Sequence, residues 1–365
     1  MKKEMKHPDK IKVLFVVESF STGVYSIVHD IACNIDSAHF EVLIIHSLRE
    51  DSPKDYKKDF SDTGVNLLYI PMDTPRNLLK SIKAIRGVIK EFNPQVIHLH
   101  SSIAGAVGRI AAKHHFRGLL LYTPHGFSFL KKDVNRIKRL IFKATEKILA
   151  IFFGGTILAI SKNEYNLAKS LTKHLFLISN FIDVRKIPSG NIVRKNTVMI
   201  CGRISTPRNP SLFNAIALAL PEVTFIWVGD GPLKDLITAP NITITGYLSR
   251  NEALRLVSEA TIYLQTSLWE GLSVSILEAM ALKKGVIASN IEANQELVAH
   301  KKTGFLCELD SLEDFVKSIK ILLNDDKLRE NFGEAGFTSV VENFDLPIAI
   351  KKYESLYSSS TQYES

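Results

Sequence analysis

The sequence is poor in cysteine and has no long apolar segment. Its three cysteines, Cys33, Cys201 and Cys307, form no Cys-x-x-Cys pair, so neither a disulfide framework nor a structural zinc site is expected. A reducing, cytoplasmic compartment is therefore predicted. The first residues are polar and lack the apolar core of a secretory signal. The longest largely apolar run, Ile148–Ile160, has thirteen residues, whereas a helix needs about 20 to cross a bilayer.

Several motifs that would indicate other functions are also missing. The loop after the first predicted strand reads Ser21-Thr22-Gly23-Val24, which is not the Gly-x-Gly-x-x-Gly pattern of a dinucleotide site. No Asp-x-Asp pair follows a predicted strand, so no metal ligands are expected. A cofactor is not expected either. No helix-turn-helix, zinc finger or interleaved basic–aromatic stretch occurs, so nucleic acid is not an expected partner. The net charge of +8 fits a phosphorylated substrate or an anionic lipid as partner, and general solubility is the alternative explanation.

Short β-branched segments alternate with segments of helical periodicity along both halves of the chain. The β-branched segments are largely apolar on both faces, which is typical of the strands of a parallel sheet covered by helices. The strands predicted in the first half are Ile11–Val17, Phe40–His46, Val65–Ile70, Gln95–His100, Leu119–Thr123, Thr156–Ile160 and Leu175–Ser179. Those predicted in the second half are Thr197–Cys201, Val223–Val228, Ile242–Thr245, Ile262–Gln265 and Gly285–Ala288.

The predicted fold class is α/β, with two doubly wound, Rossmann-like domains facing a central cleft. An N-terminal domain spans 1–184, a polar linker 185–196, a C-terminal domain 197–341, and a C-terminal helix with its tail 342–365. The linker contains Pro188 and Gly190. The last helix is predicted over Leu346–Tyr357, with Pro347 tolerated in its first turn. Ligands of such sheets bind at the carboxyl ends of the strands, so the chemistry is expected in the loops that follow strands.

The segment Trp269–Met280 is the strongest local signal for a binding site. It follows a predicted strand and opens a helix predicted over Ser275–Lys283. Backbone N–H groups at Gly271-Leu272-Ser273 would favour an anion such as a diphosphate. Glu270 and Glu278 could accept hydrogen bonds from the hydroxyls of an elongated ligand. The same spacing also occurs on ordinary surface loops and helices, so the two glutamates alone leave both interpretations open.

A second candidate loop, Cys201–Asn209, follows the first strand of the second domain. Gly202 permits a tight turn, and the guanidinium groups of Arg203 and Arg208 could clamp a diphosphate. Two solvated arginines are the alternative. The turns at Val228–Pro232 and Thr245–Ser249, which include Tyr247 and Leu248, also follow strands but are weaker signals.

In the first domain, His125 follows a predicted strand within Tyr122–Phe127. A histidine at this position could hydrogen-bond a phosphate or a sugar hydroxyl. The alternative is a turn histidine satisfied by its own backbone. Thr22 and Gly23 precede the helix predicted over Tyr25–Ile35, and their backbone N–H groups could meet an acceptor or a phosphate.

Together these motifs resemble the retaining GT-B glycosyltransferases of glycosyltransferase family 4, the group 1 glycosyltransferases of surface polysaccharide assembly. The resemblance covers about residues 10 to 340. It rests on Glu-x7-Glu at Glu270 and Glu278, on Gly202-Arg203, on Gly229–Pro232, and on Asn294-Gln295-Glu296 followed by Gly304. The combination is specific, although each element alone is weak.

The resemblance implies a role for each of these positions. Glu270 would contact the donor sugar, Glu278 the ribose hydroxyls, and the two arginines the diphosphate. The implied catalytic residues are Glu270, His125, Arg203 and Arg208. The implied donor-binding residues are Gly202, Arg203, Arg208, Tyr247, Leu248, Glu270, Gly271, Leu272, Ser273 and Glu278. On the acceptor side it implies Thr22, Gly23 and His125.

Three positions depart from the family pattern. Family members usually have lysine where this chain has Arg208, which keeps the charge but changes the geometry. Paired glycines are usual where Thr22-Gly23 stands. The stretch Asn290–Asn294 lacks a glycine that is common there.

Residues Thr123–Phe129 resemble a subgroup that acts on lipid-linked sugars. The following segment, Lys131–Lys147, carries seven basic and two acidic residues, which leaves a charge of +5. Apolar residues keep helical spacing beside the charges: Val134, Ile137, Leu140, Ile141, Ala144 and Ile148. A basic amphipathic helix of this kind could rest on an anionic bilayer through residues 131–148. The alternative is a solvated helix whose apolar stripe packs on its own domain.

The function that the resemblance implies is retaining, metal-independent transfer of a hexosyl or N-acetylhexosaminyl unit. The donor would be a nucleoside-diphosphate sugar, a UDP-sugar by preference, and the acceptor a glycan on a lipid diphosphate. The protein would then lie on the inner face of the cytoplasmic membrane. Two rival functions are a sugar-nucleotide epimerase or phosphorylase on the same fold, and a non-catalytic protein that binds anionic ligands.

Overall fold

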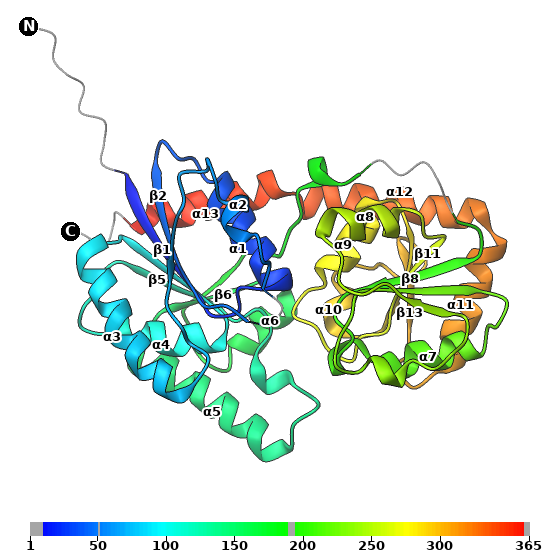
Figure 1. Cartoon of the computed structure of the whole chain (residues 1–365), viewed down its shortest axis with the longest axis horizontal. Coiled ribbons are helices and arrows are strands. Elements are labelled where there is room, and N and C mark those ends of the chain that lie inside the picture. The colour runs from blue at the N-terminus through cyan, green and yellow to red at the C-terminus, as the bar shows by residue number, and fades with distance from the viewer. Residues whose placement is uncertain (1–9, 50–51, 189–193, 361–365) are drawn as a thin grey trace, which may run out of the picture. The chain divides into compact units, whose positions relative to one another are not determined.

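The structure, a computed structural model, describes residues 10–49, 52–188 and 194–360. The chain divides into two compact units (Figure 1). The first contains the residues up to Phe129, Ile137–Ser179 and the segment from Pro347 onwards. The second contains Leu130–Arg136 and Asn180–Leu346. The predicted linker 185–196 falls in part on residues 189–193, which lie outside the described residues.

The first unit is a seven-stranded parallel sheet with the strand order β3-β2-β1-β4-β5-β6-β7. Its strands are β1 (Ile11–Val17), β2 (Phe40–His46), β3 (Asn66–Tyr69), β4 (Val96–His100), β5 (Leu119–Thr123), β6 (Thr156–Ala159) and β7 (Leu175–Leu177). All seven strands predicted in the first half are therefore confirmed. The helices around it are α1 (Thr22–Asn34), α2 (Tyr56–Asp59), α3 (Pro75–Phe92), α4 (Ser102–Ala112), α5 (Arg136–Phe153), α6 (Lys162–Ala168) and most of α13 (Leu346–Ser358).

The second unit is a six-stranded parallel sheet with the order β10-β9-β8-β11-β12-β13. Its strands are β8 (Thr197–Cys201), β9 (Thr224–Val228), β10 (Ile242–Ile244), β11 (Ile262–Gln265), β12 (Gly285–Ser289) and β13 (Gly304–Cys307). Its helices are α7 (Pro210–Leu218), α8 (Arg250–Ser258), α9 (Val274–Ala281), α10 (Glu292–Gln295), α11 (Leu312–Asn324) and α12 (Asp326–Asn343). A core that includes Trp227, Phe213 and Phe315 lies between the sheet and its helices.

Two details of the second unit differ from the sequence prediction. Strand β13 was not predicted, because it is short and begins with a glycine. That glycine is required, since a Cβ on Gly304 would lie 2.4 Å from the carbonyl oxygen of Val286. Helix α9 ends at Ala281 rather than at Lys283, whereas β12 begins at Gly285 as predicted. Lys283 itself takes the left-handed conformation, with φ 56°.

In both sheets the chain order reverses beside the first strand. β4 lies next to β1 in the first unit, and β11 lies next to β8 in the second. The loops after such a pair of strands leave in opposite directions, so a crevice opens at their carboxyl ends. In the first unit Val17 and His100 are paired residues at this edge. Each unit therefore has one favoured position for a ligand.

Helix α5, at the periphery of the first unit in Figure 1, is anchored by a buried ion pair. Arg109 of α4 donates from Nη2 to Oε2 of Glu146 of α5 at 2.8 Å. The hydroxyl of Tyr122 donates to Oε1 of the same carboxylate at 2.8 Å. Arg109 also donates to the carbonyl oxygen of Gly105 and stacks over the Tyr122 ring at 4.3 Å. Because Arg109 and Glu146 are almost completely buried, each charge depends on the other for its solvation.

We expect Glu146→Ala to destabilise the first unit by about 3–5 kcal/mol, because it leaves the Arg109 charge buried and unpaired. Thermal unfolding followed by circular dichroism measures this as a lower midpoint for one of the two units. Lys147→Ala, at an exposed neighbour on the same helix, is the matched control and should stay within about 0.5 kcal/mol of wild type. Equal midpoints for the two variants would contradict the anchoring role of the ion pair.

Candidate active site

The carboxyl ends of β8 and β11 bring Arg208 and Glu270 into contact. Nη1 of Arg208 lies 2.8 Å from Oε1 of Glu270 and donates to Oγ of Ser275 at 3.3 Å. The same Oε1 accepts hydrogen bonds from Nε2 of Gln265 at 3.1 Å and from Oγ of Ser267 at 2.8 Å. These five residues are called the Arg208 cluster below.

The hydrogen bonds of the cluster converge on one oxygen and one nitrogen. Within the described residues, Oε2 of Glu270 and both Nε and Nη2 of Arg208 have no hydrogen-bond partner. The two side chains are 15% and 18% exposed, so the pair is partly buried but accessible. Burial alone would lower the pKa of Arg208, but the charge of Glu270 raises it above its usual value, so the arginine stays charged. The cluster can therefore offer one carboxylate oxygen to hydroxyls and two guanidinium nitrogens to a phosphate.

Two glycines shape the loop that carries Arg208. Gly202 has φ 140°, and a Cβ there would lie 3.2 Å from Nε of Arg208, so the guanidinium packs directly against the glycine backbone. Gly229 has φ 142°, and its Cβ would lie 2.3 Å from the carbonyl oxygen of Gly202. The indole N–H of Trp227 donates to that carbonyl at 2.8 Å. The loops after β8 and β9 thus pack backbone to backbone, and Arg203 lies exposed on the first of them.

The amino end of α9 lies next to the Arg208 cluster, since Ser275 belongs to both. The N-cap residue Ser273 makes no side-chain capping bond to the helix backbone, and its hydroxyl lies 3.1 Å from that of Ser275. Gly271 is partly exposed, whereas Leu272 is buried with 4% exposure. A helix amino end without a side-chain cap has N–H groups and a positive dipole end to offer to an anion. Leu272 contributes packing rather than side-chain contact with a ligand.

Glu278, one turn further along α9, is held by a residue that the sequence analysis did not identify. Nε of Arg250, the first residue of α8, donates to Oε1 of Glu278 at 3.0 Å. In the sequence Arg250 is an ordinary first residue of a helix, and no spacing pattern links it to a glutamate 28 residues later. Tyr247 and Leu248 follow β10 and are 61% and 38% exposed.

In the first unit, three histidines meet at the carboxyl ends of β4 and β5. Nδ1 of His98 lies 2.8 Å from the Tyr357 hydroxyl, and its Nε2 lies 2.8 Å from Oγ1 of Thr123. Nδ1 of His100 lies 2.9 Å from Nε2 of His125. His98, His100 and His125 are called the histidine cluster below. His98 and His100 were not singled out by the sequence, where they read as interior residues of a strand.

The backbone at His125 is held in an uncommon conformation. His125 has φ 53° and Gly126 has φ 97°. The Gly126 N–H donates to the buried carboxylate of Glu164 at 2.8 Å, and that carboxylate also accepts from the N–H of Ile160 at 2.9 Å. Positive φ at a non-glycine residue costs free energy and persists where the surroundings enforce it, often at functional sites. The His125 ring hydrogen-bonds His100 and not its own backbone, and burial lowers its pKa to about 3.

The predicted acceptor-side loop is part of a helix. Thr22 and Gly23 form the first turn of α1, which was expected to begin only at Tyr25. Ser21 is the N-cap and makes no side-chain capping bond. Gly23 is exposed, and a Cβ added to it would meet nothing within 4 Å. The segment therefore presents the amino end of α1.

A buried carboxylate lies at the switch point between β1 and β4. Glu18, directly after β1, accepts from Nη2 of Arg49 at 2.7 and 2.8 Å and from the hydroxyl of Ser101 at 3.1 Å. Ser101 directly follows His100 and has φ 85°. No local sequence motif indicates this group, because its members are more than 30 residues apart and each residue type is common on surfaces.

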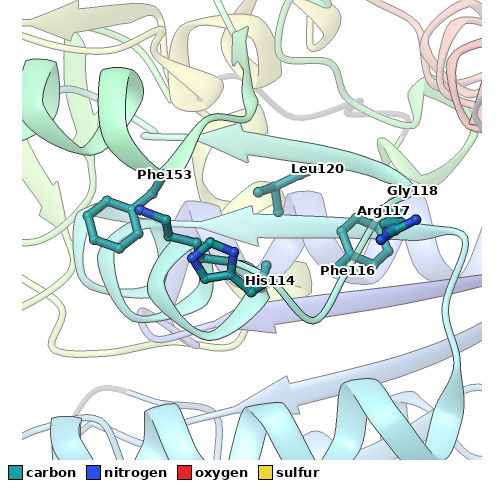
Figure 2. A pocket seen from close by; sticks show the side chains of 8 residues that line it. His114, Phe116, Arg117, Gly118, Leu120 and Phe153 are labelled. Carbon is teal, nitrogen blue, oxygen red and sulfur yellow. The ribbon is translucent and has the colours of Figure 1, made fainter.

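A separate hollow of about 290 Å³ lies at the opposite edge of the first sheet, where β5 begins (Figure 2). Lys113, His114 and Arg117 line it together with Phe116 and Phe153. Because ligands of doubly wound sheets bind at the carboxyl ends of strands, this hollow is not the candidate active site.

Within the described residues, no three His, Cys, Asp or Glu side chains are grouped so as to bind a metal ion. The same part of the chain contains no helix that is both long and apolar enough to span a bilayer.

Both halves of the chain match models of known families. The model of the group 1 glycosyl transferases matches residues 185–339, and that of glycosyltransferase family 4 matches residues 21–186. The UDP-Gal:alpha-D-GlcNAc-diphosphoundecaprenol alpha-1,3-galactosyltransferase of Escherichia coli is 26% identical over 334 residues, which are 82% of this chain and 85% of that protein. The N,N'-diacetylbacillosaminyl-diphospho-undecaprenol alpha-1,3-N-acetylgalactosaminyltransferase of Campylobacter jejuni is 23% identical over 356 residues, 87% of this chain and 94% of that protein.

Solved structures share the fold at low sequence identity. HepE of Anabaena, in complex with UDP and glucose, has a TM-score of 0.79 and 17% identity, covering 96% of this chain and all of that one. The sucrose-phosphate synthase of Thermosynechococcus elongatus has a TM-score of 0.83 and 16% identity, covering 96% of this chain and 99% of that one. These likenesses, with the two parallel sheets, establish the GT-B fold. The chain belongs to glycosyltransferase family 4, the group 1 glycosyl transferases, and is a glycosyltransferase.

Proposed function

We propose that this enzyme transfers a hexosyl or N-acetylhexosaminyl unit from a UDP-sugar, with retention and without a metal ion, to a glycan carried on a lipid diphosphate. The relatives from Escherichia coli and Campylobacter jejuni are named as enzymes acting on diphosphoundecaprenol-linked sugars, and the first as using UDP-Gal. Anabaena HepE was solved with UDP and glucose. Assembly of a surface polysaccharide is the process that such a reaction serves.

The observation that supports this proposal most directly is which atoms of the Arg208 cluster already have partners and which do not. Three donors hold one oxygen of Glu270 and leave Oε2 for a sugar hydroxyl. The same ion pair leaves Nε and Nη2 of Arg208 for the diphosphate, and we assign the ribose hydroxyls to Glu278 of α9, as the family resemblance implies. This set suits a ligand with hydroxyls at one end and two phosphates beside them.

The proposed chemistry depends on stabilising the leaving diphosphate. Arg208, Arg203 and the amino end of α9 supply positive potential where negative charge develops as the bond to the anomeric carbon breaks. Glu270 contacts Arg208, Gln265 and Ser267. A carboxylate held in this way is better suited to accept a hydrogen bond from a sugar hydroxyl than to act as a nucleophile. The acceptor hydroxyl then attacks from the face that the diphosphate leaves, and its proton passes to that diphosphate.

Helix α5 supports a place for the enzyme at the inner face of the cytoplasmic membrane. Of the predicted stripe, Ile137, Leu140, Ile141 and Ile148 are 69%, 67%, 56% and 52% exposed, so the stripe does not pack on its own domain. The helix begins at Arg136, later than predicted, and continues to Phe153, which adds Ile151 and Phe152 to the exposed face.

The exposed apolar residues of α5 keep helical spacing and so lie on one face of the helix. The core-facing residues Glu146, Leu149 and Ala150 lie on the other side. Exposed basic residues flank the apolar face, among them Lys138, Lys143 and Lys147. An apolar strip bordered by lysines fits the interface of an anionic bilayer.

Removing the charge of Arg208 tests the proposed donor site. We expect Arg208→Gln to lower kcat for sugar transfer about 10²–10³-fold, as loss of one charge-stabilising donor does. Arg208→Lys, which keeps the charge, should stay within about tenfold of wild type. Release of UDP from UDP-sugars with a lipid-diphosphate sugar acceptor gives the rates, and Lys302→Gln, at an exposed lysine of the same unit, is the control. Full activity of Arg208→Gln would exclude this role.

The same assay tests the independence from metal ions. With excess EDTA the rate should equal that in Mg²⁺ or Mn²⁺, because the positive charge at the leaving group comes from arginines and a helix end. A rate that EDTA abolishes and Mn²⁺ restores would contradict the proposed chemistry. Turnover with GDP-sugars alone would contradict only the choice of nucleotide.

Vesicle binding tests the proposed face of α5. The protein should co-sediment with phosphatidylglycerol vesicles, less so as salt rises, and only weakly with phosphatidylcholine. The double variant L140E/I148E should lower the binding constant about 100-fold or more, because two apolar side chains no longer enter the interface. Leu79→Glu, at a leucine of α3 that is 75% exposed, is the matched control. Binding that the double variant retains and Leu79→Glu loses would place the contact elsewhere.

A further inference from the structure

The contact between His100 and His125 is unusual because both rings are neutral. Burial, with smaller contributions from His98 and His125, lowers the pKa of His100 well below its usual range. Burial lowers the pKa of His125 to about 3. A neutral imidazole has one N–H donor and one lone pair. Of the two nitrogens 2.9 Å apart, Nδ1 of His100 and Nε2 of His125, one must therefore carry a proton and the other must not.

The geometry of the pair suits a direct N–H···N bond. The ring planes are within 23° of each other, so the N–H of one ring can point in its own plane at the lone pair of the other. His100 is 1% exposed at the end of β4, and the backbone of His125 is fixed by Gly126 and Glu164. Neither ring can turn away without breaking a buried contact.

The other nitrogen of His100 decides which ring donates. Its Nε2 is buried and has no hydrogen-bond partner in the described part of the chain. If His125 donated, the single proton of His100 would be on this Nε2, as a buried N–H without an acceptor. If His100 donates, only a lone pair is left unmatched there.

Buried N–H groups without an acceptor are the rarer of such defects. The ring of Phe15, at 5.4 Å between centroids and 74° between planes, would offer that N–H a weak π contact at best. The arrangement in which His100 donates is therefore favoured. It assigns the proton of His125 to Nδ1, which has no hydrogen bond within the described residues.

We propose that His100 is a positioning residue that donates its Nδ1–H to Nε2 of His125 and so fixes His125 as the Nδ1–H tautomer. His125 then presents a hydrogen-bond donor, not a base, to an oxygen of the sugar or of the acceptor. This consequence rests on the proposed transferase function, whereas the tautomer itself does not.

Nitrogen NMR of the protein labelled with ¹⁵N-histidine reads the tautomer directly. The spectrum of the whole chain at neutral pH is recorded, and the His125 signals are assigned by their loss in His125→Gln. We expect a protonated Nδ1 and a bare Nε2 for His125. The opposite tautomer in wild type would overturn the proposal whether or not the enzyme turns over.

His100→Leu should change the His125 spectrum to a mixture of tautomers. The same substitution should lower kcat about fivefold to tenfold, which corresponds to the free energy of one hydrogen bond. The KM for the donor should change little. His100→Asn, whose amide nitrogen can occupy the place of Nδ1, should restore both. Tyr357→Phe removes a hydrogen bond of the neighbouring His98 and is the control, with the His125 spectrum unchanged.

The two readouts separate the inference from the proposed function. A His125 tautomer that does not respond to His100→Leu, in a variant whose thermal unfolding shows that it folds, would overturn the role of His100. An enzyme that transfers no sugar from any UDP-sugar, but whose His125 behaves as described, would refute the proposed substrate and leave the tautomer assignment in place.

Discussion

The reversal of strand order beside β1 and β8 is the constraint on which the candidate sites depend. In a parallel sheet the carboxyl ends of all strands lie on the same side. The loops after most neighbouring strands leave in the same direction, each leading to its own helix. Only where the order reverses do two loops diverge and leave room for a ligand. Arg208 and Glu270 come from the two loops on either side of that point in the second unit. Glu18 and Ser101 come from the two loops on either side of it in the first.

Within that frame, close backbone packing determines which groups are available. Because Gly202 and Gly229 have no Cβ, the loops after β8 and β9 touch, and the guanidinium of Arg208 rests on the backbone of Gly202. The arginine is thereby held where one nitrogen binds Glu270 and two others remain without a partner in the described residues. A side chain at residue 202 would displace the guanidinium. The glycine and the arginine therefore act together, although they are six positions apart in the sequence.

Local sequence patterns predicted the strands of both sheets and the candidate residues that lie near the strand ends. Runs such as Ile11–Val17 and Thr197–Cys201 are apolar on both faces, which only covered parallel strands require, so their positions were predictable. Glu270 and Arg208 were found because each lies in a loop that follows a predicted strand, and Glu278 because it completes the Glu-x7-Glu pattern of the family resemblance. Whether they and His125 act as the family resemblance implies stays a prediction.

Partners that are distant in sequence were not predictable. Arg250, His100, Glu164 and Glu18 belong to common residue types, and their roles arise from contacts with residues 28, 25, 38 and 83 positions away. The orientation of α5 was not predictable either, because the spacing of its apolar residues fits a buried face as well as an exposed one. The buried position of Glu146, paired with Arg109, shows which side of the helix faces the core.

The same ion pair explains how a helix with so much exposed apolar surface can be held in place. An amphipathic helix usually buries its apolar stripe against its own domain, and that burial supplies most of its stability. In α5 the core-facing side contributes Leu149 and Ala150 and a charged group in place of a wider stripe. Since a buried carboxylate is stable only with its partner, Arg109 fixes the rotation of the helix as well as its position. The apolar face is left outward, which is a cost in water and would be an advantage at the bilayer surface proposed above.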